Sequence, residues 1–219
     1  MKESAHDHWL GFDLGGTKMF AVVFDGSMQV VGRFRQKTHG QRGKDEGVPR
    51  VLWCIEQSLA TAGLEAGRLA GIGIGCPGVV DWRDGILVDA PNLGWSNVRL
   101  AAAVEEHFGV PARLVNDVDA GTYGEFRQGA GRGAGTLLGV FPGTGLGAGC
   151  IVDGRLLRHR RYSCMELGRM RIPSTSLVGN DCGLIPVETA CSRLAIASAC
   201  AMEAYRGRAP TVFELAGTD

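Results

Sequence analysis

The sequence has no excess charge of either sign. Its 219 residues include 23 Lys and Arg and 23 Asp and Glu, so the formal net charge is zero. A domain that binds nucleic acid usually has a basic excess or a basic stripe. The nearest candidate is the short run RLLRHRR at 155–161, which we interpret as a solvated loop face. The charge pattern therefore argues against nucleic acid as a partner.

Long hydrophobic runs are also missing. No stretch is long and apolar enough to span a bilayer, and the first residues, MKESAHDHWLGFDLGG, lack the apolar centre of a signal peptide. The seven cysteines are odd in number and do not have the regular spacing of a disulfide framework. These absences predict a reduced, cytoplasmic protein with no membrane partner.

Glycine, by contrast, is abundant, at 34 residues. Half of the glycines gather at Gly11–Gly16, Gly71–Gly78 and Gly129–Gly154, and each group follows a predicted strand. Glycine supplies positive φ and lets the backbone approach a ligand closely. Tight turns alone explain any one of these groups, whereas the three together favour a ligand cleft.

The hydrophobic pattern predicts strands that alternate with helices. Apolar residues at i, i+3, i+4 and i+7 predict a helix, and short apolar runs that end in turn residues predict strands. The expected strands cover 10–13, 19–24, 29–36, 69–75 and 112–115, and the expected helices cover 48–63, 100–108, 119–128, 186–205 and 211–215. Such alternation is typical of a layered α/β fold.

Two segments of equal length resemble each other. Leu10–Gly26 reads LGFDLGGTKMFAVVFDG and Leu138–Gly154 reads LGVFPGTGLGAGCIVDG, each a strand, a glycine-threonine turn, a strand and a closing Asp-Gly. Chance similarity of two hairpins is the alternative. A duplication predicts two similar subdomains, 1–118 and 119–219, with a cleft between them. This is the plan of the actin-like ATPase (ribonuclease H-like) fold.

The two glycine turns are candidates for binding phosphate. Backbone N–H groups of such turns can point at phosphate oxygens, and a threonine hydroxyl adds a donor. Asp13 ends a strand and could hold Mg²⁺ directly or through water. Lys18 fits a surface position and a phosphate contact equally well. The candidate ATP-binding residues are Asp13, Gly15, Gly16, Thr17, Lys18, Gly143, Thr144 and Gly145.

Asn116 and Asp117 follow the predicted strand 112–115. Functional groups gather beyond the carboxyl ends of strands in open α/β sheets. A carboxylate there can accept the proton of a sugar hydroxyl as that oxygen attacks a phosphoryl group. The alternative is that Asp117 or Asp119 caps the N-terminus of the following helix.

These motifs occur together in the order seen in one family. They are Asp13–Lys18, Gly71–Gly75 with Pro77-Gly78, Pro91–Trp95, Asn116-Asp117, Gly143–Gly145 and Glu166–Gly168. In this respect the chain resembles the ROK family of bacterial sugar kinases and related repressors. The resemblance implies a homodimeric, ATP- and Mg²⁺-dependent hexose kinase acting on the 6-hydroxyl of glucose or a related sugar. It implies that Asp117 is the catalytic base and that sugar hydroxyls are bound by Asn92, Asn116, Glu166 and Glu188.

The chain departs from the family pattern at two places. ROK kinases carry Glu-x-Gly-His, whose His binds zinc together with cysteines of a nearby loop, but here that position is Arg169 and the loop 179–188 keeps only Cys182. We therefore predict no zinc. The chain is also shorter than ROK kinases, so we expect an incomplete second subdomain. A non-catalytic or degenerate ROK sugar-binding or regulatory protein is the alternative, and an acetate kinase relative fits less well.

Overall fold

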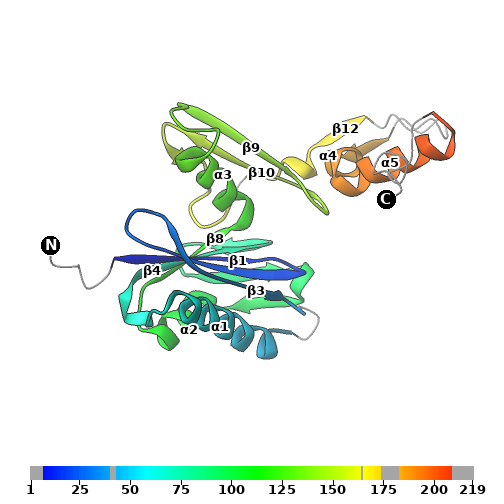
Figure 1. Cartoon of the computed structure of the whole chain (residues 1–219). Coiled ribbons are helices and arrows are strands. Elements are labelled where there is room, and N and C mark those ends of the chain that lie inside the picture. The colour runs from blue at the N-terminus through cyan, green and yellow to red at the C-terminus, as the bar shows by residue number, and fades with distance from the viewer. Residues whose placement is uncertain (1–6, 40–42, 164, 174–182, 209–219) are drawn as a thin grey trace.

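Two separate sets of strands lie on either side of one connecting helix, α3 (Figure 1). The computed structural model describes residues 7–39, 43–163, 165–173 and 183–208. The strands are β1 (His8–Leu14), β2 (Lys18–Phe24), β3 (Val30–Lys37), β4 (Leu69–Cys76), β5 (Val79–Asp81), β6 (Ile86–Ala90), β7 (Trp95–Val98), β8 (Ala112–Asn116), β9 (Thr136–Pro142), β10 (Leu146–Val152), β11 (Arg155–Leu156), β12 (Arg171–Pro173) and β13 (Leu184–Pro186). The helices are α1 (Gly43–Ala62), α2 (Leu100–Phe108), α3 (Asp117–Gln128), α4 (Val187–Cys191) and α5 (Arg193–Tyr205), with short 3-10 turns at η2 (Ala66–Arg68), η3 (Pro91–Leu93) and η4 (Leu167–Arg169).

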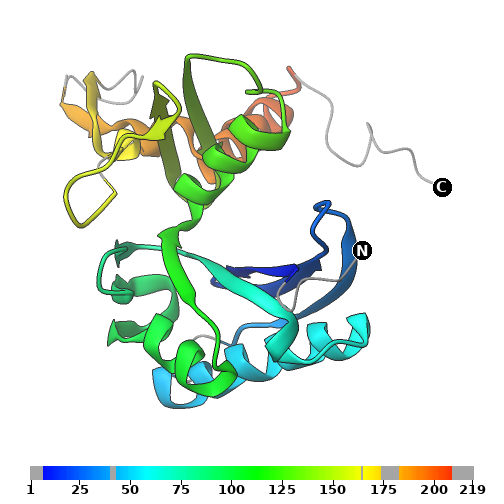
Figure 2. The same cartoon turned by 90° about the vertical axis from the view of Figure 1, so that its left-hand side faces the viewer.

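The larger sheet has five strands in the order β3-β2-β1-β4-β8. Strands β1, β2 and β3 are antiparallel, and β4 and β8 continue the sheet in parallel with β1. Leu10, Phe12 and Leu14 of β1 are buried on one face, as the two-residue period of a strand requires. Helices α1 and α2 cover this face, and α3 lies on the opposite side (Figures 1 and 2). We call residues 7–116 the first lobe.

The hydrophobic core lies in the first lobe. The apolar stripe of α1, with Val51 and Ile55 fully buried, packs against the covered face of the sheet. Among the described residues beyond α3, the buried hydrophobic side chains are Ala148 and Ile151. We call residues 136–208 the second lobe. Its sheet therefore depends on α3, which packs against β9 and β10.

The two predicted hairpins form with matching boundaries. Strands β9 and β10 begin and end 128 positions after β1 and β2 at all four boundaries. The register differs by one residue, because Leu14 pairs with Met19 in the first hairpin whereas Pro142 pairs with Leu146 in the second. The duplication is thus present in the structure, with the second turn one residue tighter than the first.

Most of the predicted elements are confirmed, and three expectations are wrong. The sheet β5-β6-β7 was not expected, because its strands of three to five residues are too short to show an alternating pattern. The single helix expected over 186–205 is two helices, because Ser192 adopts an extended conformation and caps α5 through Ala195 N. Two helices begin earlier than expected, α1 at Gly43 rather than Val48 and α3 at Asp117 rather than Asp119. The short helix expected over 211–215 lies outside the described residues.

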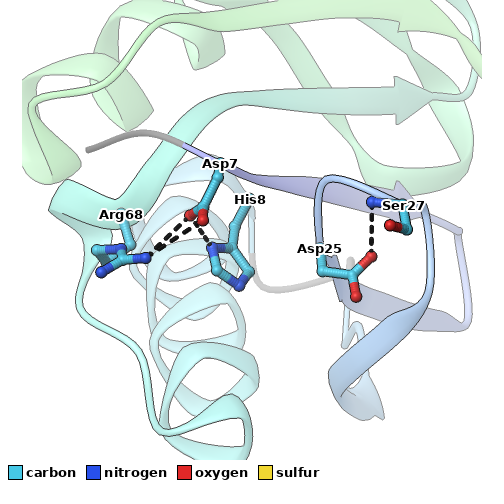
Figure 3. A network of polar contacts seen from close by, with 5 residues as sticks. All are labelled: Asp7, His8, Asp25, Ser27 and Arg68. Atoms are coloured by element: carbon cyan, nitrogen blue, oxygen red, sulfur yellow. Dashed lines mark hydrogen bonds and ion pairs between the residues drawn. The ribbon is translucent and has the colours of Figure 1, made fainter. Parts of the chain in front are cut away.

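Polar contacts fasten the beginning of β1 to the sheet. Figure 3 shows Arg68, at the end of η2, donating to both carboxylate oxygens of Asp7 at 3.1 and 3.3 Å, while His8 Nδ1 lies 2.6 Å from Asp7 Oδ1. In the β2–β3 turn of the same figure, Ser27 N donates to Asp25 Oδ1 at 2.8 Å. The Asp7–Arg68 pair ties the beginning of β1 to the residue before β4, whereas the Ser27 contact is local to its own turn. Within the described part of the chain, no helix combines the length and apolar character needed to cross a membrane.

Candidate active site between the lobes

A cavity of about 590 Å³ lies between the two lobes. The first lobe contributes residues from the β1–β2 turn, the segment after β4, the β6–β7 connection and the end of β8. The second lobe contributes the β9–β10 turn and the segments around η4 and α4. The lining residues that carry polar side chains are Asp89, Asn92, Asn116, Asp117, Thr144, Ser163, Glu166, Arg169 and Glu188. The cavity therefore combines amide, carboxylate and hydroxyl groups with two glycine turns.

The first glycine turn is held by a buried threonine. Thr38 is 1% exposed, its N–H donates to Thr17 O at 2.9 Å, and its hydroxyl donates to Gly15 O at 2.6 Å. A Cβ at Gly15 would lie 2.6 Å from Lys18 O, so only glycine fits this tight turn. Gly16 reaches the cavity beside Asn92. The turn is thus a rigid backbone surface at the edge of the cavity.

The second glycine turn faces the same cavity from the other lobe. Gly143 N donates to Gly145 O at 2.9 Å, and Arg193 N, at the start of α5, donates to Gly143 O at 3.0 Å. Glu188 lies directly over this turn, because its Oε2 accepts from Leu146 N at 3.4 Å. A Cβ at Gly145 would lie 2.7 Å from the same oxygen. Glu188 and this turn are separate predictions from the sequence, and the structure brings them into contact.

The junction of β8 and α3 carries the two residues expected at the carboxyl end of the strand. Asn116 Oδ1 accepts from Val118 N at 3.0 Å and from Asp119 N at 3.3 Å, so Asn116 is the helix cap. The alternative that Asp117 or Asp119 caps this helix is therefore wrong. The Nδ2 group of Asn116 also donates to Gly78 O at 3.1 Å. This places Asp117 in the first turn of α3, where it lines the cavity.

Asp13 lies near the end of β1, and Asp117 directly follows β8. Strand β4 lies between β1 and β8 in the large sheet. Gly75 lies between them in the sheet, and a Cβ there would be 3.6 Å from Asp117 Cα. Burial raises the pKa of Asp117, and the negative charge of Asp13 raises it further. The pKa of Asp13 is also raised by partial desolvation, which the charge of Arg35 opposes. The pair is thus an acidic centre in which the charge of Asp13 disfavours the ionisation of Asp117.

Asn92 and Glu166 reach the cavity from opposite lobes. Asn92 lies in η3, which ends at Gly94 in the left-handed conformation (φ 65°). Glu166 precedes η4, and its Oε2 lies 3.0 Å from Arg169 Nε. Arg169 also lines the cavity, so the residue at the family's His position faces the same space. Its guanidinium occupies part of the hydrogen-bonding capacity of Glu166.

The structure brings together most of the predicted site residues but not all of them. Those that line the cavity are Gly16, Asn92, Asn116, Asp117, Gly143, Thr144, Gly145, Glu166 and Glu188. Asp13 lines a second, larger cavity on the other side of Asp117. Gly15, Thr17 and Lys18 line neither cavity, although Thr17 and Lys18 are exposed at the tip of the first hairpin. Asp117 is common to both cavities.

Several contributing residues were not expected from the sequence. Asp89 and Ser163 line the cavity, and Thr38 fixes the first turn from outside it. None of these three residues stands in a glycine motif, so no local sequence signal marks them as part of the site. The interpretation of 155–161 as a solvated loop face agrees with the exposure of Arg155, Arg160 and Arg161, and two arginines of the segment also contact the first lobe. Arg161 pairs with Asp81 and Asp84, and the Arg158 guanidinium lies 4.5 Å from the ring centroid of Trp82.

The acidic centre does not form a protein-only metal cage. Among the described residues, no group of three or more His, Cys, Asp or Glu side chains is placed to hold a metal ion. Mg²⁺ usually binds through one or two carboxylates together with water and substrate phosphates, so Asp13 and its surroundings fit that ion. Residues 179–182 of the loop 179–188, including Cys182, lie outside the described residues, and the absence of zinc stays a prediction.

The match to a known family identifies the family to which this chain belongs. The family model described as "ROK family" matches residues 9–218. The chain belongs to the ROK family. Within the family, the chain is 28% identical over 178 residues to a glucokinase of Halalkalibacterium halodurans, a match that covers 81% of this chain and 54% of the relative. It is 33% identical over 165 residues to a xylose repressor of Caldicellulosiruptor bescii, covering 74% and 41%. Sugar kinases and repressors are thus both among its ROK relatives.

Solved structures of ROK proteins share the fold. The structure resembles a ROK family glucokinase from Streptomyces griseus in complex with glucose and AMPPNP, with a TM-score of 0.75, 28% identity and coverage of 91% of this chain and 62% of that one. It also resembles a ROK hexokinase from Thermus thermophilus, with a TM-score of 0.72, 30% identity and coverage of 91% and 64%. The expected α/β actin-like ATPase fold is confirmed. The chain spans about half the length of the curated ROK relatives described above.

Proposed function

We propose that the chain carries the sugar- and phosphate-contacting part of an ATP-dependent hexose kinase, which transfers the γ-phosphoryl group to the 6-hydroxyl of glucose or a related hexose. The observation that carries the proposal is the composition of one cavity. Asp117, four further polar residues expected to hold sugar and both glycine turns converge on a space of about 590 Å³. Such a volume suits a small, polar ligand that is bound between two lobes.

Asp117 acts as the general base. Phosphoryl transfer depends mainly on positioning and charge neutralisation, so one well-placed carboxylate can supply the proton acceptor. Burial and the charge of Asp13 raise the pKa of Asp117, which makes the ionised carboxylate a stronger proton acceptor. Its Oδ1 is held by Val118 N at 2.9 Å, which leaves Oδ2 for the sugar hydroxyl.

The sugar ring is held by amide and carboxylate groups from both lobes. A hexose offers adjacent hydroxyls that can pair with Asn and Glu side chains. Asn92 comes from the first lobe, and Glu166 and Glu188 come from the second. Asn116 already uses its oxygen as a helix cap and one N–H on Gly78, so it has a single N–H left for sugar. Its main part is to hold Asp117 in position.

The two glycine turns bind the nucleotide phosphates. Their backbone N–H groups offer donors to phosphate oxygens, and Thr17 and Thr144 add hydroxyls. Asp13 is the residue that would hold Mg²⁺, directly or through water, together with those phosphates. When bound, Mg²⁺ neutralises part of the phosphate charge. The assembly as a homodimer and a cytoplasmic location belong to the same proposal and follow from the family resemblance.

A sugar-binding regulator without catalysis is the second candidate. It is favoured by the match to the xylose repressor and by the contact of Arg169 with Glu166, which alters the sugar side of the cavity. Both candidates require sugar in this cavity, and only the first requires Asp117 as a base. They are therefore separated by turnover rather than by binding.

The test is MgATP-dependent phosphorylation of glucose, fructose, mannose and N-acetylhexosamines, with calorimetry of sugar binding alongside. The Asp117→Asn variant is compared with Asp119→Asn, the same change two positions later in the same helix at a residue that lines neither cavity. We expect turnover to fall by about 10²-fold or more in Asp117→Asn only. Sugar binding without turnover in the parent chain would instead support the regulator. If the parent chain shows no sugar binding and no turnover, both candidates are refuted.

A further inference from the structure

A polar contact joins the two lobes at a point outside the cavity. Arg161 Nε, in the second lobe, donates to Asp81 Oδ2 at 2.8 Å, and its Nη2 group also pairs with Asp84. The backbone takes part as well, because Trp82 N donates to Arg161 O at 3.2 Å. The same turn is covered by Arg158, whose guanidinium packs on the Trp82 ring. The contact therefore has three components that come from two short segments.

The partner on the first lobe is built to accept this arginine. Asp81 is 3% exposed, and its Oδ1 accepts from Arg83 N at 3.2 Å and from Asp84 N at 3.3 Å. The carboxylate thus shapes the β5–β6 turn with one oxygen and holds Arg161 with the other. A buried carboxylate without its cation would be costly, so the pair favours the arrangement of the lobes seen here.

Both segments lead directly into the cavity. On the first lobe, the turn held by Asp81 connects β5 to β6, and β6 leads on to Asp89 and Asn92 in the cavity lining. On the second lobe, Arg161 is followed by Ser163 and Glu166, which line the opposite side. The ion pair therefore connects the two segments that carry Asn92 and Glu166.

We propose that Arg161 is a positioning residue, which ties the β5–β6 turn to residues 161–163 and 165–169 and thereby sets the separation of Asn92 and Glu166 across the sugar cavity. This inference rests on the proposed function for its effect on sugar. Arg161 acts through Asp81 and Asp84 and does not line the cavity itself. The expected loss is in sugar affinity rather than in the chemical step, because Asp117 and both glycine turns are held by other contacts.

The experiment compares Arg161→Ala with Arg161→Lys and with Arg160→Ala, which removes the same charge one position away. We expect Arg161→Ala to raise the KM for sugar about 10-fold while kcat changes much less, and Arg161→Lys to restore part of the affinity. Asp84→Ala should raise KM in the same direction, and combining it with Arg161→Ala should add little. An equal effect in Arg160→Ala, or an unchanged KM in Arg161→Ala, would overturn the proposal.

Hydrogen exchange supplies a readout that does not require sugar. We expect the Trp82 amide and the amides of 86–92 and 165–169 to exchange faster in Arg161→Ala than in the parent chain and in Arg160→Ala. If the parent chain neither binds nor phosphorylates a sugar, the proposed function fails, and the exchange data still decide whether Arg161 orders both segments. Unchanged exchange in these segments would refute the positioning role by itself.

Discussion

Replacement of Asn116 by alanine tests how the β8–α3 junction is held. The change removes the acceptor for Val118 N and Asp119 N and the donor to Gly78 O. Asp117 Oδ1 lies 2.9 Å from the same Val118 N, so the N–H left without a protein partner is that of Asp119. Loss of an Asn cap costs about 1 kcal/mol, and loss of a water-accessible hydrogen bond adds about 0.5 kcal/mol.

The expected decrease in the free energy of unfolding is therefore about 1.5 kcal/mol. For a chain of this size it corresponds to a melting temperature lower by about 5 °C. The assay is urea denaturation followed by circular dichroism, together with thermal melting. Asn116→Ser is the matched control, because serine keeps the cap acceptor and lacks the amide donor, so it should lose only about 0.5 kcal/mol. A loss as large in the serine variant as in the alanine variant would refute the assignment of Asn116 as the cap.

Three further predictions concern the acidic centre, the core and the metal content. Burial raises the pKa of Asp117 above its value in the unfolded chain, so the ionised carboxylate lowers the stability of the folded chain at pH values above the folded pKa. Asp117→Asn should therefore have a higher melting temperature than the parent chain at pH 7. This difference should disappear as the pH falls to about 4. A lower melting temperature at pH 7 would contradict this sign. Gly47→Ala would place a Cβ 1.8 Å from Cζ2 of the buried Trp95, so it should lower the free energy of unfolding, measured by urea denaturation, by about 3 kcal/mol. Gly67→Ala is the control, because the space at its Cβ is open, and it should change this free energy by no more than about 0.5 kcal/mol. Dialysis against a chelator should leave the melting temperature unchanged, since Arg169 stands where the family's zinc-binding His would be; a marked drop would show that a structural metal is present.

Local sequence patterns were informative wherever a strand or turn depends on its own residues. The alternation in β1 and β2, the glycines that only a tight turn accepts and the repeat at 138–154 all depend on contacts within a few residues. They predicted both hairpins and the order of the main strands and helices. Expectations failed where local signals were weak. The short sheet β5-β6-β7 has no measurable period, and the break at Ser192 is set by a single cap inside an alanine-rich segment.

The sequence by itself determined the family, the fold class and the identity of six of the nine polar residues that line the cavity. It did so because the glycine turns and the Asn-Asp pair are short motifs with a fixed order along the chain. Only the tertiary structure decided that Asn116 rather than Asp117 caps α3, that Glu188 lies over the second glycine turn, and that Arg161 joins the two lobes. The cap is a local contact, but Asn and Asp cap helices about equally well, so the sequence does not choose between Asn116 and Asp117. The other two facts depend on contacts between residues 42 and 80 positions apart, and no local pattern records which distant residue a side chain will meet.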